Sequence, residues 1–333
     1  MTTQPQVAAT SLLARMRPLW YPLAFVLVLL GLRGFVQTPS ALYMVGLMAV
    51  YAVGALGLNL MFGLGGMLSL AQAAIMAVGG YVSALAMTKL GLSFLLSLVI
   101  AAVLSAIFSA LASLSALRVA THYFVLVTIG IAQIISLFLV NQQSLTGGFD
   151  GLAGIPPLTI AGRDLSDPWL MAIVTLAVMF VGWYAADAFR SSRAGYAAVA
   201  SSDDPQVAMA CGISIPRARM VAATVGGLYA GVAGAFFAEL LQFLGPSDFG
   251  LDKALLFLLI VVIGGLGSNA GTVFAAVLLT YLSQGLLQLK AVGPLVYGLG
   301  IMVILVAVPN GFAGVVHRVR GRLATFSNRK RTV

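Results

Sequence analysis

The sequence predicts an all-α integral membrane protein, a polytopic bundle of about ten transmembrane or re-entrant helices. Of its 333 residues, 61% are hydrophobic and only 8% are charged, whereas soluble domains carry about 25% charged residues. The mean hydropathy is +1.05. Apolar stretches of the roughly 20 residues needed to cross a bilayer recur from Leu19 to Val308. Lipid is therefore the expected solvent for most of the chain.

Hydrophobic runs bounded by charged residues, glycine or proline give ten candidate spans. They lie at about 19–37, 41–62, 67–88, 92–117, 121–141, 168–188, 218–243, 251–266, 270–289 and 292–309. The eighth is short, so we interpret it as a span or a re-entrant element. Arg15 and Arg17 precede the first run and no clean cleavage site follows it, which favours a retained first helix over a signal peptide.

Basic residues orient these spans, because loops rich in Lys and Arg stay in the cytoplasm. With ten spans and a cytoplasmic N-terminus, 13 of the 18 Lys and Arg residues fall in inner segments. Both termini are then cytoplasmic. We expect an N-terminal segment at 1–18, a membrane domain at 19–310 with an outer loop at about 142–167 and an inner loop at about 189–217, and a basic tail at 311–333 that contacts lipid headgroups. This topology explains the net charge of +9 without a nucleic-acid partner.

The inner loop carries a local helix signal. Asp204 is a suitable N-cap, Pro205 suits the first helical position, and Gly212 suits the C-terminal stop. We expect a helix of about seven residues, roughly 10 Å long. Small side chains at Ala208, Ala210 and Cys211 would let the surface of another protein come close. A plain solvated connector is the alternative interpretation.

Glycine clusters and isolated polar residues interrupt the apolar runs. Interrupted helices often border a passage, whereas tight loops or close helix packing explain the same glycines. For each polar residue, an interhelical hydrogen bond is expected ahead of a substrate contact. The candidate passage residues are Asn59, Gly65, Gly66, Gln72, Thr128, Gln133, Gly264, Gly265 and Gly267.

Several functional classes are disfavoured by what the sequence lacks. No ionisable residue is expected near mid-membrane, where ion-coupled carriers keep one, because Arg33, Asp187 and Glu239 lie close to span ends. There is no G-x-x-x-x-G-K-[ST] phosphate loop and no catalytic cluster. With Cys211 as the single cysteine, no Cys/His spacing predicts a metal site. We therefore expect a chain that is not an enzyme and holds no cofactor, with energy supplied by another subunit or a passive pathway.

Five stretches of the chain resemble one family. GYAAVASSDDPQVAMACGISIPR from Gly195 resembles the cytoplasmic coupling segment of ABC importer permeases. Four more stretches are similar to the LivM-type permeases of branched-chain amino acid importers, and they keep the order of the family over about 41–314. They are LGLNLMFGLGGMLSLAQAAIMAVGGY from Leu56, THYFVLVTIGIAQII from Thr121, LTGGFDGLAGIP from Leu145 and VVIGGLGSNAGTVFAA from Val261.

The resemblance implies a permease subunit of a bacterial inner membrane that pairs with a second, related permease. It also implies two cytoplasmic ATPase subunits, which bind the ATP, and an extracytoplasmic binding protein that delivers a branched-chain or other hydrophobic amino acid. The alternatives are a permease for urea, an amide or an aromatic acid, and a stand-alone secondary carrier or channel.

The resemblance also assigns contact residues. ATPase contact falls to Gly195, Asp203, Asp204, Pro205, Ala208, Cys211 and Gly212, and binding-protein contact to Thr146, Gly147, Gly148 and Asp150. One departure stands out, because the family carries an Ile-Arg-Glu-Asp-like stretch where this chain has residues 200–204, Ala-Ser-Ser-Asp-Asp. The basic residue is missing, which implies a divergent partner ATPase.

Overall fold

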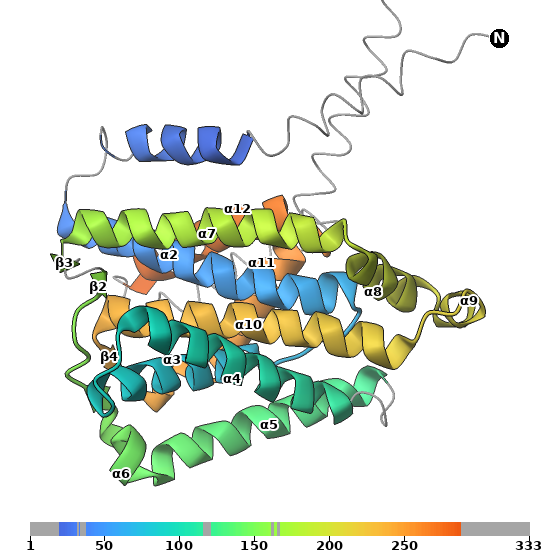
Figure 1. Cartoon of the computed structure of the whole chain (residues 1–333), viewed down its shortest axis with the longest axis horizontal. Helices are drawn as coiled ribbons and strands as arrows, with labels where there is room; N and C mark the ends of the chain where they lie inside the picture. The colour runs from blue at the N-terminus through green and yellow to red at the C-terminus, as the bar shows by residue number, and fades with distance from the viewer. Residues whose placement is uncertain are drawn as a thin grey trace, which may run out of the picture.

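A computed structural model describes residues 20–31, 33, 38–115, 121–160, 163–164 and 167–287, which form a helical bundle (Figure 1). Five of the described helices are long and apolar enough to cross a membrane. They are α2 (Pro39–Leu58) with its continuation η1 (Asn59–Leu64), α4 (Phe94–Ser115), α5 (Thr121–Asn141), α7 (Pro168–Arg190) and α10 (Ile215–Leu241). Other helices complete the bundle: Trp20–Gly31, α3 (Gln72–Thr88), α11 (Leu251–Gly264) and α12 (Asn269–Leu287).

Each predicted span between 19 and 289 coincides with one of these helices. The third begins later than predicted, at Gln72, because residues 67–71 are not helical. α11 has 14 residues, a length of roughly 21 Å, which is too short to cross a hydrocarbon core of about 30 Å. The tenth predicted span and the segments 1–18 and 311–333 lie outside the described residues. The total of about ten helices and the location of the termini therefore stay predictions.

α10 is the central helix and packs against α2, α3 and α4 (Figure 1). Its buried face is rich in alanine and glycine, which let neighbouring backbones approach closely. A methyl group at Gly57 would lie 2.6 Å from the Gly226 carbonyl oxygen, and one at Gly79 would lie 2.5 Å from the Gly231 Cα. Close backbone packing at these glycines therefore holds the centre of the bundle together.

The helix Trp20–Gly31 lies along α7 at the edge of the bundle (Figure 1). The Tyr21 ring meets Trp183 and Tyr184 edge-on, with centroids 5.6 and 5.5 Å apart. The Tyr21 hydroxyl also donates a hydrogen bond to Asp187. Aromatic packing and one polar contact thus attach this helix to α7.

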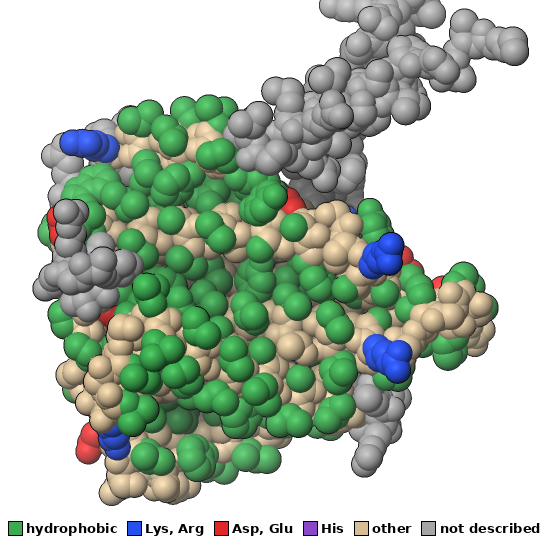
Figure 2. Space-filling model, in the orientation of Figure 1, with side chains coloured by type: hydrophobic (Ala, Val, Ile, Leu, Met, Phe, Trp, Pro, Cys, Tyr) green, Lys and Arg blue, Asp and Glu red, His purple; other side chains and the backbone are tan. Residues whose placement is uncertain are grey.

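The bundle has two distinct ends. At one end α8 (Arg193–Asp203) and α9 (Pro205–Ala210) connect α7 to α10 and project from the bundle (Figure 1). At the opposite end lie α6 (Gln143–Thr146), η2 (Gly148–Asp150) and η3 (Pro246–Phe249), with β1 (Leu152–Ala153) paired antiparallel to β4 (Phe243–Leu244) and β2 (Thr159–Ile160) to β3 (Arg163–Asp164). Figure 2 shows hydrophobic side chains over the side of the bundle, with Lys and Arg only toward its ends. This is the distribution expected where the sides face lipid.

Candidate functional site

The inner loop predicted at 189–217 folds into two helices at the end that projects. Ser192 caps α8, because its Oγ accepts a hydrogen bond from the Gly195 N–H at 3.1 Å. Asp204 caps α9, with Oδ1 accepting from the N–H groups of Gln206 and Val207 at 3.0 and 3.1 Å. Gly212 follows α9 with a left-handed φ of 78°. The predicted short helix is confirmed, whereas α8 was not predicted.

The exposed face of α9 is apolar. Val207 and Met209 are 58% and 57% exposed, while Ala208 is 3% exposed. Of the small side chains predicted to form the contact surface, Ala208 is buried, whereas Ala210 and Cys211 are exposed. Val207 and Met209 add larger apolar side chains to the exposed surface of α9. Among the other predicted ATPase-contact residues, those from 203 to 205 and Gly212 are exposed.

Gly195 is buried and has a structural role. A methyl group at Gly195 would lie 2.2 Å from the Phe189 carbonyl oxygen and 2.8 Å from that of Arg190. Only glycine allows α8 to turn back so closely on the end of α7. A direct contact of Gly195 with another subunit is not favoured by this position.

The two predicted glycine clusters meet at the same end of the bundle. α2 continues into one turn of π-helix, η1, a feature that is frequent at functional sites. Gly66, Gly265 and Gly267 have left-handed φ values of 66°, 97° and 74°. A methyl group at Gly63 would lie only 2.3 Å from the Gly267 nitrogen. The break after α2 and the turn between α11 and α12 thus pack directly on each other.

Buried and partly buried hydrogen bonds join these breaks to the end of α7. The Asn59 Nδ2 donates to Asn269 Oδ1 at 2.9 Å, and Asn59 Oδ1 accepts from the Gly267 N–H at 2.9 Å. Asn269 Nδ2 donates to Asp187 Oδ1 at 2.7 Å, and Arg190 Nη1 donates to the Gly267 carbonyl oxygen at 2.7 Å. We call these five residues the polar junction. It connects α2, α7 and the α11–α12 turn next to the start of α8.

α8 also touches the break after α2 directly. A methyl group at Gly66 would lie 2.4 Å from the Ser202 Oγ and 3.1 Å from its Cβ. Ser202 lies one residue before the end of α8. The segment that carries α9 therefore reaches the glycine break through Ser202, and the polar junction through Arg190.

The polar residues within the spans have different environments. Gln72 is fully buried, and its Nε2 donates to carbonyl oxygens of α2 and α10 at 3.0 and 3.3 Å. Thr128 is also buried, and its Oγ1 accepts from the Leu70 N–H at 3.1 Å. These bonds confirm the predicted hydrogen bonding between segments. Gln133 differs, because it is exposed and borders a cavity of about 60 Å³ between α5 and the start of α11.

The predicted binding-protein loop at the opposite end is a compact turn. Thr146 is buried, and its hydroxyl donates to the Leu139 carbonyl oxygen at 2.6 Å. A methyl group at Gly147 would lie 2.0 Å from the Gly151 carbonyl oxygen, and Gly148 is buried. These three residues shape the loop. Asp150 is the exposed member of the predicted set.

Glu239 has a position that the sequence did not reveal. It lies two residues before the end of α10, as the span prediction implied, yet it is 3% exposed. It borders a cavity of about 140 Å³ at the opposite end, beside Tyr43 and Gln242. Its carboxylate oxygens have no hydrogen-bond partner within the described part of the chain. A polar cavity of this size has room for water that solvates the carboxyl group.

Comparison with known proteins decides the class. Residues 40–308 match the family described as the permease component of the branched-chain amino acid transport system. The chain belongs to this permease family. The match covers every element of the polar junction and the whole of α8 and α9. No solved structure matches the chain.

Individual relatives of the permease agree with the family. It is 28% identical over 279 residues to the high-affinity branched-chain amino acid transport system permease protein LivM of Salmonella typhimurium and to that of Escherichia coli K12. The alignments cover 77% of this chain and 65% of each LivM protein, so the chain spans less than two thirds of these relatives. It is also 28% identical over 287 residues to LivH of Salmonella typhimurium, covering 80% of this chain and 92% of LivH.

Asn269 of the polar junction and Ser202 of α8 were not among the residues predicted from the sequence. Asn269 lies two residues after the second glycine cluster, at the edge of a predicted span. Ser202 was interpreted only as part of a divergent loop, and no glycine lies near it in sequence. Both residues have partners that lie far away in sequence.

Proposed function

We propose that this permease is a transmembrane subunit of an ABC importer in a bacterial inner membrane. In this proposal it translocates branched-chain or other hydrophobic amino acids that an extracytoplasmic binding protein delivers. A second, related permease completes the passage, and two cytoplasmic ATPase subunits bind and hydrolyse ATP. The observation that carries the proposal is the family match over 40–308, together with a capped helix that projects from one end of the bundle.

The geometry of α9 suits it to receive a push from another protein. Two hydrogen bonds from Asp204 fix its first turn, and Val207 and Met209 offer an exposed apolar contact. An apolar patch on a projecting element favours protein contact. In this mechanism the ATPase binds the face of α9 that carries Val207 and Met209, and Asp204 keeps the helix in register.

Two contacts would transmit a movement of α9 to the breaks in the helices. One is the contact of Ser202 with Gly66, and the other is the hydrogen bond from Arg190 to Gly267. Interrupted helices border the solute pathway in many transporters, and access alternates as one part of the protein rocks against another around that site. We infer that the two glycine breaks change position as the passage alternates between outward and inward access.

The described spans supply little that would bind a charged solute tightly. Asn59, the Nε2 of Gln72 and Thr128 are committed to hydrogen bonds within the protein, whereas the buried Gln72 Oε1 has no partner among the described residues. Selectivity is then assigned to the binding protein, and the permease needs only a weakly binding passage. The same arrangement would serve urea, an amide or an aromatic acid, which are the alternative solutes.

Proteoliposomes test the proposal. Vesicles that contain the permease, its related permease and both ATPases, with ATP on the ATPase side and the loaded binding protein on the other, should accumulate leucine or valine. Omission of ATP or of any subunit should abolish accumulation. The rival class, a secondary carrier, predicts uptake by this chain alone under an imposed ion gradient, and that result would contradict the proposal.

A further inference from the structure

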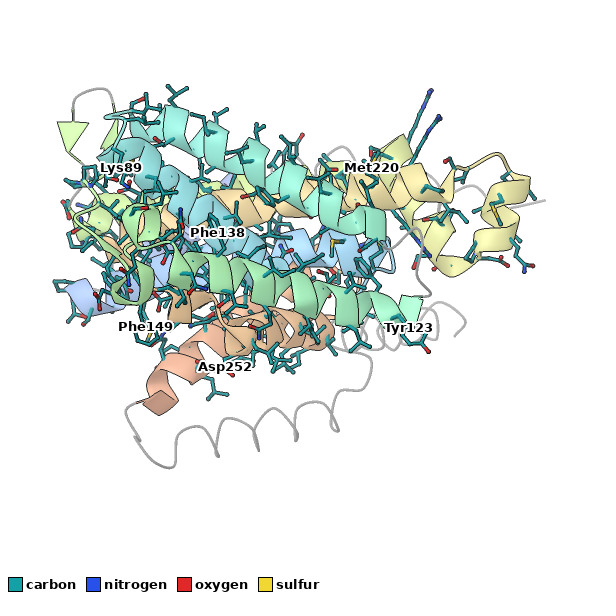
Figure 3. The ribbon with its side chains drawn as sticks, turned by 90° about the horizontal axis from the view of Figure 1, so that it is seen from below. Lys89, Tyr123, Phe138, Phe149, Met220 and Asp252 are labelled. Atoms are coloured by element: carbon teal, nitrogen blue, oxygen red, sulfur yellow. The ribbon has the colours of Figure 1, made fainter. Side chains whose placement is uncertain are left out.

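Among the spanning helices that the structure describes, α5 is the least enclosed. Only 22% of its most apolar 18-residue window is buried, compared with 39% for α4 and α7 and 67% for α10. In Figure 1 it lies at one edge of the bundle, beyond α3 and α4. Figure 3 views the molecule from this side, with α5 in front and its residues Tyr123 and Phe138 labelled.

The exposed face of α5 has the spacing of a helix-packing seam. Exposed residues recur at intervals of three and four, a period of about 3.5 that is typical of helices packed side by side. The seam consists of Tyr123, Leu126, Gly130, Gln133 and Leu137. Of these, Tyr123, Leu126 and Leu137 are 62%, 63% and 59% exposed. A large apolar surface is thus left uncovered along the whole helix.

Two residues at the centre of the seam suit a helix–helix interface. Gln133 exposes an amide about 3 Å from the midpoint of α5, where lipid tails offer no hydrogen bond. Gly130 lies one turn away, and a methyl group there would meet nothing within 4 Å. A small residue beside a polar one is the combination by which membrane helices approach closely and hydrogen-bond.

α4 shows what a lipid-facing helix looks like in the same subunit. Four of its five serines, at 97, 105, 109 and 113, are buried, and the fifth, Ser115 at the end of the helix, is partly buried. Its outward residues are large and apolar, among them Val99, Val103, Ile107 and Leu111 at 47–58% exposed. The polar side chains of α4 therefore turn inward, whereas Gln133 of α5 turns outward. The contrast favours a protein partner for α5 and lipid for α4.

The uncovered surface continues onto the start of α11. Gln133 borders the cavity of about 60 Å³ together with Gly250, Leu251 and Ala254. Leu251 and Leu255 are 47% and 41% exposed on the far side of that cavity. The surface thus spans two helices and includes a polar group at its centre.

We infer that the seam on α5, with the start of α11, is the surface that binds the second, related permease. This inference rests on the proposed function. The seam extends to the middle of the membrane, which restricts the proteins that can bind it. ATPases and binding proteins work in water and cannot reach that depth. The similarity of this chain to both LivM and LivH, two permease proteins of branched-chain amino acid transport systems, favours a related chain as the partner. Gln133 then finds its hydrogen bonds at this interface.

Site-specific photocrosslinking tests the inference. Benzoylphenylalanine is incorporated at Leu126 or Leu137 of α5, and at Val103 or Ile107 of α4 as matched controls, in cells that express the complete importer. After illumination, the α5 positions should give adducts with the related permease, identified by mass spectrometry, and the α4 positions should give none. Adducts from α5 with a second copy of this chain, no protein adduct from α5, or equal adducts from α4 would each overturn the inference.

A substitution gives a second, quantitative test. Gly130→Trp places a bulky ring in the seam, whereas Val103→Trp places the same ring on α4. Gly130→Trp should reduce the related permease recovered with this chain by about tenfold or more, and Val103→Trp should leave the recovery unchanged. Equal recovery from both variants would overturn the inference. Uptake by the unmodified complex is measured in parallel, so failure of the proposed function is seen separately from failure of the interface.

Discussion

Asp204 is the residue on which the structure of α9 most depends. α9 has only six residues, too few to be stable as an isolated helix. Its first turn is held by the two hydrogen bonds that Asp204 Oδ1 accepts. Because the carboxylate is exposed, the cap and the negative charge can be separated by substitution.

We expect Asp204→Ala to weaken ATP-driven uptake by about fivefold while ATP hydrolysis continues, because loss of an N-cap costs about 1 kcal/mol and frays the helix. Asp204→Asn retains the acceptor oxygen and should behave like the parent if capping is the main role. Ser214→Ala is the control, since Ser214 occupies the N-cap of α10 without a side-chain hydrogen bond. Uptake and ATP hydrolysis are measured in proteoliposomes. Parental uptake by Asp204→Ala would contradict a coupling role for α9.

A substitution at Gly63 tests the close contact between the two helix breaks. A methyl group at this position would lie 2.3 Å from the Gly267 nitrogen and 2.4 Å from Asn59 Oδ1, and neither atom moves easily. Overpacking of this kind costs about 1–3 kcal/mol, so Gly63→Ala should lower the melting temperature in detergent by several degrees. Gly182→Ala is the control within α7, where the nearest atom is 3.4 Å away. Equal stability of the two variants would show that the breaks do not pack as described.

Among the elements, α8 is the link between α9 and the break after α2. Its buried residues Gly195, Ala198 and Ser201 pack on the bundle, and α9 follows α8 after Asp204 alone. Ser202 at its end lies against Gly66. If force passes along this route, a side chain inserted at that contact should disturb transport more than it disturbs folding.

Gly66→Ala is therefore expected to reduce uptake strongly while the protein still reaches the membrane. Gly91→Ala is a matched control, because Gly91 has a similar left-handed φ of 63° but nothing within 4 Å of an added methyl group. Both substitutions impose the same backbone strain of roughly 1–2 kcal/mol, and only the first pushes on α8. Ser202→Gly combined with Gly66→Ala should restore part of the uptake. If Gly91→Ala impairs uptake as much, backbone strain and not the Ser202 contact explains the effect.

The elements that could be predicted from the sequence were those with local signals. Apolar length located the helices, and Asp204, Pro205 and Gly212 located α9. α8 was not predicted, because its short run of small residues has no apolar stretch long enough to signal a span and its packing against α10 is a tertiary contact. The polar junction could not be predicted either, since Asn59 and Asn269 are 210 residues apart in sequence. The burial of Ala208 and the outward direction of Gln133 likewise depend on tertiary packing.

At the scale of the whole molecule, the described residues form a helical bundle. Its centre is made of closely packed alanine and glycine around α10, its sides are apolar (Figure 2), and its projecting end carries α8 and α9. The polar junction lies between that end and the two broken helices. This arrangement explains how a force applied outside the membrane could open a passage within it.

The claim that this permease depends on partner subunits and ATP is tested most directly by leucine accumulation in proteoliposomes. The proteoliposomes contain either this chain alone or the complete set of subunits with binding protein and ATP. We predict accumulation against a gradient only in the complete set, and its loss when ATP is omitted. Accumulation by the purified chain alone, driven by an ion gradient, would contradict it.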